Sequence, residues 1–227
     1  MSPIEISNLA TAIHRWLSYQ CLCGREALLS EAYLGQPVAE FLMHHHGHGF
    51  EAEVDHPVLV RPGPGRPRQF DYALRNRLSE EIEVAIECKW IAGRPYDKQR
   101  ILNDLLRLEC VRTPGKPVRR YFVVAGLKDD FDRNFKSLKF SDARTFTRSL
   151  LSFSISKWER RIEPLDAHER IRELYKRFED DFNAEVPRRF ATRLLGYRTA
   201  DGIAVAIWQV AHAKGRLTFS PADLWAS

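Results

Sequence analysis

The clearest alternation of apolar and polar side chains in the chain lies between residues 82 and 91. This two-residue period predicts a β-strand that buries one face. A second, shorter strand is predicted for residues 70 to 74, and a short polar turn separates the two, which indicates a β-hairpin. The apolar positions of the longer strand are Ile82, Val84, Ile86, Cys88 and Trp90, and the opposite face carries Glu83, Ala85, Glu87, Lys89 and Ile91.

The centre of the turn determines how the two strands pair. If Ser79 is that centre, Asp71 lies opposite Glu87 and Arg75 lies opposite Glu83, and the opposite charges of the second pair favour this register. Asp71, Glu87 and Lys89 then share one face of the hairpin. The strand repeat separates Glu87 from Lys89 by about 7 Å.

Two neighbouring carboxylates repel each other, so one of them takes up a proton unless a cation lies between them. Mg²⁺ accepts carboxylate oxygens, water and phosphate oxygens as ligands, polarises a phosphoryl group and lowers the pKa of a bound water. A lysine beside such an ion stabilises the charge that develops on phosphate oxygens. The structural alternative is an exposed hairpin on which Glu87 and Lys89 form a solvated ion pair.

Asp71 followed by Glu87-Cys88-Lys89 resembles the motif of the PD-(D/E)xK nuclease superfamily, over roughly residues 26 to 127. The proline of that motif is absent, because Phe70 precedes Asp71. The resemblance implies a restriction-endonuclease-like fold and metal-dependent phosphodiester hydrolysis with Mg²⁺ or Mn²⁺. It implies that Asp71 and Glu87 bind the metal, with the backbone carbonyl of Cys88 as a further ligand, and that Lys89 is the catalytic lysine.

Many members of this superfamily carry a glutamate near the metal, on the helix before the first strand. Residues 25 to 46 are predicted to be helical with an interruption near Pro37, where a second segment begins. Glu31 shares an apolar stripe with Leu34 and Val38, so Glu31 is the candidate for that role. The alternative, given equal weight, is a glutamate at the surface.

The run from His44 to His48 is a second candidate for metal binding. Imidazoles and thiolates are zinc ligands, and Cys21 and Cys23 lie upstream, but the spacing matches no compact zinc module. Histidines in the last turn of a helix also interact favourably with its carbonyls, which is the structural alternative.

Two basic segments are candidates for contact with nucleic acid. Arg61, Arg66 and Arg68 belong to a stiff proline- and glycine-rich loop that leads into the strand with Asp71, and arginines there suit phosphate binding. The alternative is a solvated loop. Lys98 and Gln99 begin a helix predicted from about residue 96 to 111, near the expected site.

That helix and the apolar run at residues 121 to 126 predict the sheet topology. Strand, helix and strand form a right-handed crossover between parallel strands, so the sheet is mixed. Asp104 and Arg107 are predicted on a solvated, salt-bridged helix face.

The fold predicted for residues 1 to 227 is a single α/β domain with a restriction-endonuclease-like mixed sheet flanked by helices. It has an N-terminal helical segment (1–24), a nuclease-like core (25–127) and a C-terminal extension (128–227). The further elements are expected at residues 3–20 (helix), 128–148 (helix), 150–155 (strand), 166–184 (helix), and 190–197 with 203–210 (hairpin).

Composition narrows the functional classes. The chain has 227 residues, 44% hydrophobic content and a net charge of +5, which fits a folded protein with a polyanionic partner. Four cysteines without a disulfide framework, and the lack of a signal peptide or apolar span, indicate a cytoplasmic protein with no membrane partner.

Three functions remain. The first is a Mg²⁺-dependent nuclease acting on DNA, or with less support on RNA. The second is a non-catalytic nucleic-acid-binding or protein-interaction module on the same fold, because fold does not determine function. The third is a regulatory subunit whose partner supplies specificity. A homodimer or a partner protein is compatible with each.

Overall fold

The computed structural model describes residues 1–59, 68–93, 98–113, 116–136, 151, 153, 158–159, 186–187, 190–212 and 218–219. The central feature is one mixed sheet of six long strands and a two-residue strand at one edge, β5. A separate pair joins β6 (Val186–Pro187) to β9 (Thr218–Phe219). The strands of the main sheet are β1 (Phe50–Asp55), β2 (Gln69–Arg75), β3 (Ile82–Ile91), β4 (Arg119–Leu127), β5 (Trp158–Glu159), β7 (Phe190–Ala200) and β8 (Ile203–His212).

The order across the main sheet is β1-β2-β3-β4-β8-β7-β5. Strands β3 and β4 are parallel, and the other neighbouring pairs are antiparallel. The parallel pair is joined through helix α3 (Lys98–Cys110), as the apolar pattern predicts. The predicted α/β class, with a mixed sheet flanked by helices, is therefore confirmed.

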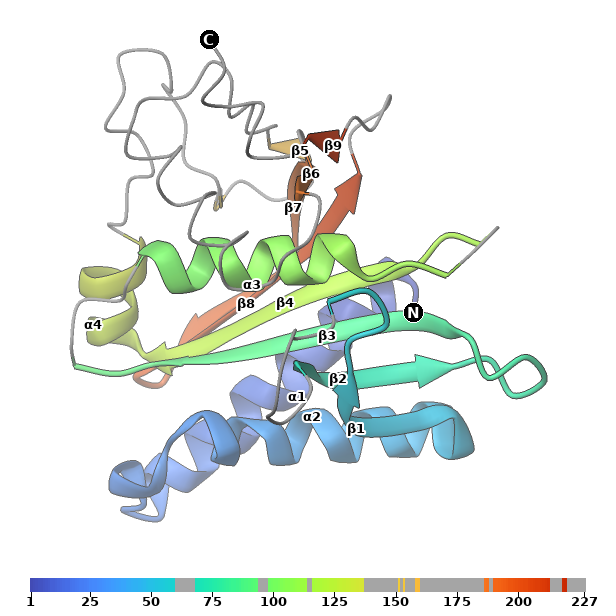
Figure 1. The fold of residues 1–227 in the computed structure, drawn as a ribbon. Helices are drawn as coiled ribbons and strands as arrows, with labels where there is room; N and C mark the ends of the chain where they lie inside the picture. Colours follow the sequence, from blue (N-terminus) through green and yellow to red (C-terminus); the bar gives the residue numbers. More distant parts are fainter. Residues whose placement is uncertain are drawn as a thin grey trace, which may run out of the picture.

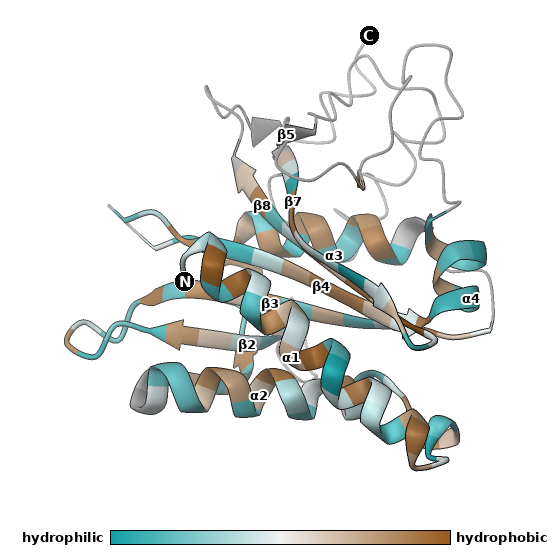
Figure 2. Ribbon diagram, turned by 180° about the vertical axis from the view of Figure 1, so that it is seen from behind, coloured by the Kyte–Doolittle hydropathy of each residue, from teal (hydrophilic) through white to brown (hydrophobic). Residues whose placement is uncertain are grey.

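Helices cover both faces of the sheet (Figure 1). Helices α1 (Pro3–Leu22) and α2 (Glu31–His46) pack on one face, and α3 packs on the other. Seen from behind, α1 crosses the near side of the sheet and α3 lies on the far side (Figure 2). Phe131 and Phe135, from α4 (Lys128–Phe131) and the π-helical turn η3 (Asp132–Lys136), join the α3 side.

The β2–β3 hairpin is predicted correctly except beside its turn. Tyr72 lies opposite Ile86, in the expected register, but the register shifts after Leu74 and Arg75 pairs with Ile82. The predicted Arg75–Glu83 pair is therefore wrong. Arg75 instead contacts Glu51 of β1.

The same register shift changes the direction of one side chain. It turns Ile82 toward the α3 side, where Ile82 packs in the cluster with Ala85 and Ile91 instead of sharing the face of Val84. Glu83 accepts a hydrogen bond from Asn76 Nδ2 at 2.6 Å. The error is one of local geometry, because a β-bulge is not visible in a period-2 pattern.

The two N-terminal helices each begin after a capping serine, and α2 begins at Glu31 and not at residue 25 as predicted. The Ser2 hydroxyl accepts from the Glu5 amide at 3.2 Å, and the Ser30 hydroxyl accepts from the Tyr33 amide at 3.2 Å. The predicted interruption near Pro37 is wrong, because α2 continues through this residue. Proline removes one helical hydrogen bond, and the burial of Leu34, Val38 and Leu42 against the sheet keeps the helix continuous.

The C-terminal hairpin forms where its turn sequence predicts. Asp201 and Gly202 both have positive φ, 49° and 74°, as a two-residue hairpin turn requires. Strand β8 pairs with β4, so this hairpin extends the central sheet and is not a separate addition. Helix α1 packs on β7 and β8, and Gly196 allows the close approach, because a Cβ there would lie 2.9 Å from Ala10 Cβ.

The predictions for the remaining segments have different outcomes. The helix expected over residues 128–148 is present as far as residue 136, and the rest lies outside the described residues. Leu151 and Phe153 are not in a strand, which contradicts the strand expected over 150–155. The helix predicted for 166–184 lies outside the described residues. Within the described part of the chain, no helix is long and apolar enough to cross a membrane.

Candidate functional site

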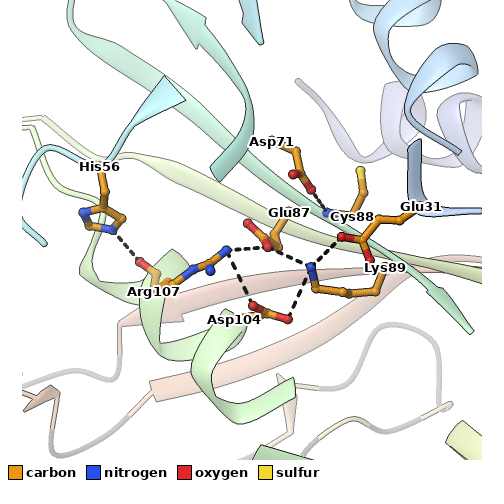
Figure 3. Close-up of polar contacts among 8 residues, drawn as sticks. All are labelled: Glu31, His56, Asp71, Glu87, Cys88, Lys89, Asp104 and Arg107. Carbon is orange, nitrogen blue, oxygen red and sulfur yellow. Dashed lines mark hydrogen bonds and ion pairs between the residues drawn. The ribbon is translucent and has the colours of Figure 1, made fainter. Parts of the chain in front are cut away.

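Asp71 of β2 and Glu87 and Lys89 of β3 lie together in the sheet, as the hairpin pattern predicts (Figure 3). The even positions of β3, Val84, Ile86 and Cys88, pack toward α1 and α2, so Glu87 and Lys89 project toward α3. Asp71 Oδ2 accepts a hydrogen bond from the Cys88 amide at 2.6 Å.

The ammonium of Lys89 is the centre of the group. Its Nζ lies 3.1 Å from Glu87 Oε1, 3.0 Å from Glu31 Oε1 and 3.7 Å from Asp104 Oδ2 (Figure 3). The side chain of Lys89 is 13% exposed, whereas that of Glu31 is 48% exposed. Glu31 is the first residue of α2, so the predicted candidate reaches the site from the rim.

Arg107 of α3 approaches Glu87 from the opposite side. Its Nη2 lies 2.5 Å from Glu87 Oε1 and 3.5 Å from Asp104 Oδ1. Lys89 and Arg107 therefore both contact the same oxygen of Glu87. The other oxygen, Oε2, is buried and has no hydrogen-bond partner among the described residues.

His56, which follows β1, holds this part of α3 in place. Its Nδ1 accepts from the amides of Val58 and Leu59, at 3.1 Å and 2.9 Å. The proton of the neutral ring therefore resides on Nε2, which donates to the Arg107 carbonyl at 2.9 Å. Burial lowers the pKa of His56 to about 4, so the ring is neutral at physiological pH.

The pKa values at the site are strongly perturbed. Burial, followed by the negative charge of Glu87, raises the pKa of Asp71 to about 7. The same two causes, in the same order, raise the pKa of Asp104 to about 7. Burial alone would lower the pKa of Lys89, but the charges of Glu87, Asp104 and Glu31 outweigh it and raise that pKa above its ordinary value.

These pKa values reflect an excess of acid. Among the described residues of the site, four carboxylates accompany two cations, which leaves two negative charges uncompensated when all are ionised. The carboxylates are those of Glu31, Asp71, Glu87 and Asp104, and the cations are Lys89 and Arg107.

Asp104, Arg107 and His56 are the site residues that sequence reasoning missed. The prediction that Asp104 and Arg107 lie on a solvated face is wrong, because Asp104 is 5% exposed and Arg107 contacts Glu87. The signal for Asp104 was present in the sequence. It falls within the inward stripe of Ile101, Leu105 and Leu108, at the spacing of one helix face.

The other predicted residues are distributed as follows. Arg61 and Arg66, and the side chains of Lys98 and Gln99, lie outside the described residues. Arg68 is half-buried beside β2, and its carbonyl accepts from the His56 amide at 2.7 Å.

The fit to a divalent cation rests on donor type. Carboxylate oxygens are the ligands that Mg²⁺ prefers, and Glu87 Oε2 is a buried oxygen without a partner. The carboxylates of Glu31, Glu87 and Asp104 nevertheless contact Lys89 or Arg107, and Asp71 contacts the Cys88 amide, so the four do not converge on a common point. No three His, Cys, Asp or Glu side chains in the described ranges form a metal-binding group. The described side chains of Cys21, Cys23 and the histidine run therefore do not form the zinc site considered above.

Comparisons with known proteins found no matching family model, no matching curated protein and no matching solved structure.

Proposed function

We propose that this chain is a metal-dependent nuclease of the PD-(D/E)xK type that hydrolyses phosphodiester bonds in DNA. The observation that carries the proposal is the acid excess around a buried lysine. The two negative charges left uncompensated when all four carboxylates ionise, together with a buried, unpartnered oxygen on Glu87, are costly in a protein interior. One divalent cation would neutralise that excess.

Asp71 and Glu87 would hold Mg²⁺ or Mn²⁺, with the Cys88 carbonyl as a further ligand. Glu87 Oε2 is the oxygen available for this role, because Lys89 and Arg107 both contact Oε1. Asp71 Oδ1 is the corresponding oxygen of Asp71, since Oδ2 accepts from the Cys88 amide. The bound ion would polarise the phosphoryl group and lower the pKa of a coordinated water.

Lys89 is the proposed catalytic residue. A lysine has donors only, so it does not compete as a metal ligand. It carries a proton at every pH of interest, because its pKa is raised by the surrounding carboxylates. A fixed ammonium at this position would stabilise negative charge on the phosphate oxygens in the transition state.

Arg107 and Asp104 have a positioning role in this proposal. Arg107 holds Glu87 by one oxygen and is itself held by Asp104. Asp104 also lies 3.7 Å from the Lys89 ammonium. Residues of α3 therefore hold Glu87 and, together with Glu31 of α2, hold Lys89. Rigid placement of this kind is what a catalytic group requires.

A non-catalytic binding module remains the second candidate, and one observation favours it. Lys89 and Arg107 already make ion pairs with the carboxylates, and a buried ion-pair network of this kind also occurs as a structural feature. The net charge of +5 fits nucleic acid as the partner of either candidate.

The test is incubation of the purified protein with supercoiled plasmid and with single-stranded DNA in Mg²⁺, Mn²⁺ or EDTA. We expect cleavage with a divalent metal, none in EDTA, and none with Asp71→Ala. Lys128→Ala is the matched control, because Lys128 forms an exposed ion pair with Asp132 and with none of the described carboxylates around Lys89. Absence of cleavage by wild-type protein in both metals, with DNA binding retained, would favour the binding module.

A further inference from the structure

A cavity of about 500 Å³ lies at the turn end of the β2–β3 hairpin. It is bounded by the end of β2, the start of β3, the start of β4 and the last turn of α2. Its volume falls within the range of small-molecule sites in proteins. The proposed nuclease site does not account for it, because none of the carboxylates around Lys89 lines it.

The charge of the cavity is opposite to that of the site around Lys89. Glu83 is the one acid among the described residues that line it, and this carboxylate accepts from Asn76 at 2.6 Å. Three arginines, Arg75, Arg77 and Arg119, and two histidines, His45 and His46, also line the cavity. The three guanidinium groups outnumber the one carboxylate, so an anion would enter a region of net positive charge.

These basic groups lie close enough to repel one another. Burial lowers the pKa of His46, the charge of Glu5 opposes this, and the positive charges of the N-terminal ammonium, His45 and Arg119 lower it further. His46 Nε2 is buried and makes no hydrogen bond within the described part of the chain, although it lies 3.6 Å from Glu5 Oε1. A bound anion would relieve this repulsion.

The guanidinium groups differ in how far they are already engaged. Arg75 is held by Glu51 and by the carbonyl of Glu80. Arg119 Nη1 donates to the Met1 carbonyl at 2.7 Å, which fixes Arg119 at the cavity wall. Arg77 is exposed, and no hydrogen bond or ion pair joins it to another described residue.

The cavity also has an exposed apolar side chain. Leu78 of the hairpin turn lines it and is 97% exposed, whereas Leu74, Val84 and Met1 line it but are themselves buried. A small inorganic anion would leave Leu78 without a contact, whereas a phosphate ester with a flat apolar group would cover it. The lining therefore distinguishes between a bare anion and an organic phosphate.

We propose that this cavity binds the terminal phosphate monoester of a nucleotide, with Arg77 and Arg119 on the phosphate and the nucleoside against Leu78. The ligand is either a free mononucleotide or the phosphorylated end of an oligonucleotide. The site is separate from that of Lys89. Val84 faces α1 and α2, whereas Glu87 and Lys89 project toward α3, and five residues of β3 span roughly 17 Å.

Titration calorimetry in EDTA tests the proposal without involving a metal. Deoxyadenosine 5′-monophosphate should bind saturably at one site, inorganic phosphate more weakly, and deoxyadenosine not measurably. Arg77→Glu should weaken nucleotide binding by ~10-fold or more, because a hydrogen-bonded charge pair is replaced by repulsion. Arg119→Gln should weaken it in the same direction, and it serves as the second variant.

Arg15→Glu is the matched control, since Arg15 is exposed on α1. It lies roughly 18 Å along the helix from the first residue of α1, the end that is next to the cavity. This variant and Asp71→Ala should bind the nucleotide as wild type does. The proposal is overturned if the nucleotide does not bind, if both Arg77→Glu and Arg119→Gln bind it as wild type does, or if Asp71→Ala abolishes binding.

A trinucleotide with and without a 5′-phosphate identifies the source of the ligand. Tighter binding of the phosphorylated form than of the free mononucleotide indicates a strand end, and the reverse indicates a free nucleotide. Either result supports the cavity as the site. Equal binding of the phosphorylated and unphosphorylated trinucleotides would contradict recognition of a terminal phosphate.

Discussion

The two carboxylate oxygens of Glu87 have different surroundings, and this difference explains why Glu87 is the proposed metal ligand. Oε1 contacts both Lys89 and Arg107, whereas Oε2 is buried without a hydrogen-bond partner among the described residues. An orphaned carboxylate oxygen in a protein interior is costly. The sequence predicted that Glu87 and Lys89 share a face of the hairpin. It did not predict that Arg107 of α3 contacts the same Glu87 oxygen as Lys89.

Asp71 provides a prediction for the metal-free protein. Its pKa is about 7 in the folded state, mainly because of burial and then the charge of Glu87, and 3.8 is its ordinary value. Between these values the folded state binds more protons than the unfolded state, so this group lowers stability as pH rises from about 4 to about 7. Asp71→Asn removes that penalty and keeps an oxygen that accepts from Cys88.

We therefore expect the melting temperature of Asp71→Asn in EDTA, relative to wild type, to increase between about pH 5 and about pH 8. The scale is about 1.4 kcal/mol for each unit of pKa shift. A constant difference for Asp71→Asn would show that the pKa of Asp71 is not raised.

At the scale of elements, the site is assembled from one hairpin and two helices. The hairpin was predictable, since a period-2 pattern fixes which residues share a face. The contribution of α3 was predictable in part. Asp104 lies in the inward stripe of its helix, but a salt-bridged surface face is the commoner arrangement for charges at this spacing. The link from His56 to α3 was not predictable, because it joins residues 51 positions apart.

His56 is expected to hold α3 against the edge of the sheet. It is buried, and it makes three hydrogen bonds, to the amides of Val58 and Leu59 and to the carbonyl of Arg107. His56→Ala leaves these groups unpaired. We expect a loss of about 3 kcal/mol in the free energy of unfolding, measured in urea.

His44→Ala is the control for His56, because His44 is exposed in the last turn of α2. It should change the free energy of unfolding by less than about 0.5 kcal/mol. If His56→Ala lowered the free energy of unfolding no more than His44→Ala does, the role of His56 in holding α3 against the sheet would be contradicted.

At the scale of the whole molecule, the sheet separates two charged regions. The acid-rich site lies on the α3 side of β3, and the basic cavity lies on the α1 and α2 side at the hairpin turn. The sequence predicted the first region, because its residues are close together along one hairpin. The second region could not be predicted, because its basic residues come from α2, the hairpin and β4 and meet only in the folded chain.

The same distinction explains the prediction of the fold. Strand and helix periodicity predicted the mixed sheet, the crossover through α3 and the C-terminal hairpin, all of which depend on local patterns. Pairing of β8 with β4 places that hairpin inside the sheet, and periodicity does not specify which strands become neighbours. The helix break predicted at Pro37 does not occur, because packing of α2 on the sheet overrides the tendency of proline to interrupt a helix.

Lys89→Ala, measured for Mn²⁺ affinity and for single-turnover DNA cleavage on the same preparation, separates the proposed catalytic role of Lys89 from metal binding by the carboxylates. The Lys89 ammonium neutralises Glu31, Glu87 and Asp104, so its removal should leave Mn²⁺ affinity equal to or higher than that of wild type. Cleavage should fall by about 10²–10³-fold, because a positioned donor to transition-state charge is lost. Cleavage at the wild-type rate by Lys89→Ala, or loss of Mn²⁺ binding together with cleavage, would contradict the account.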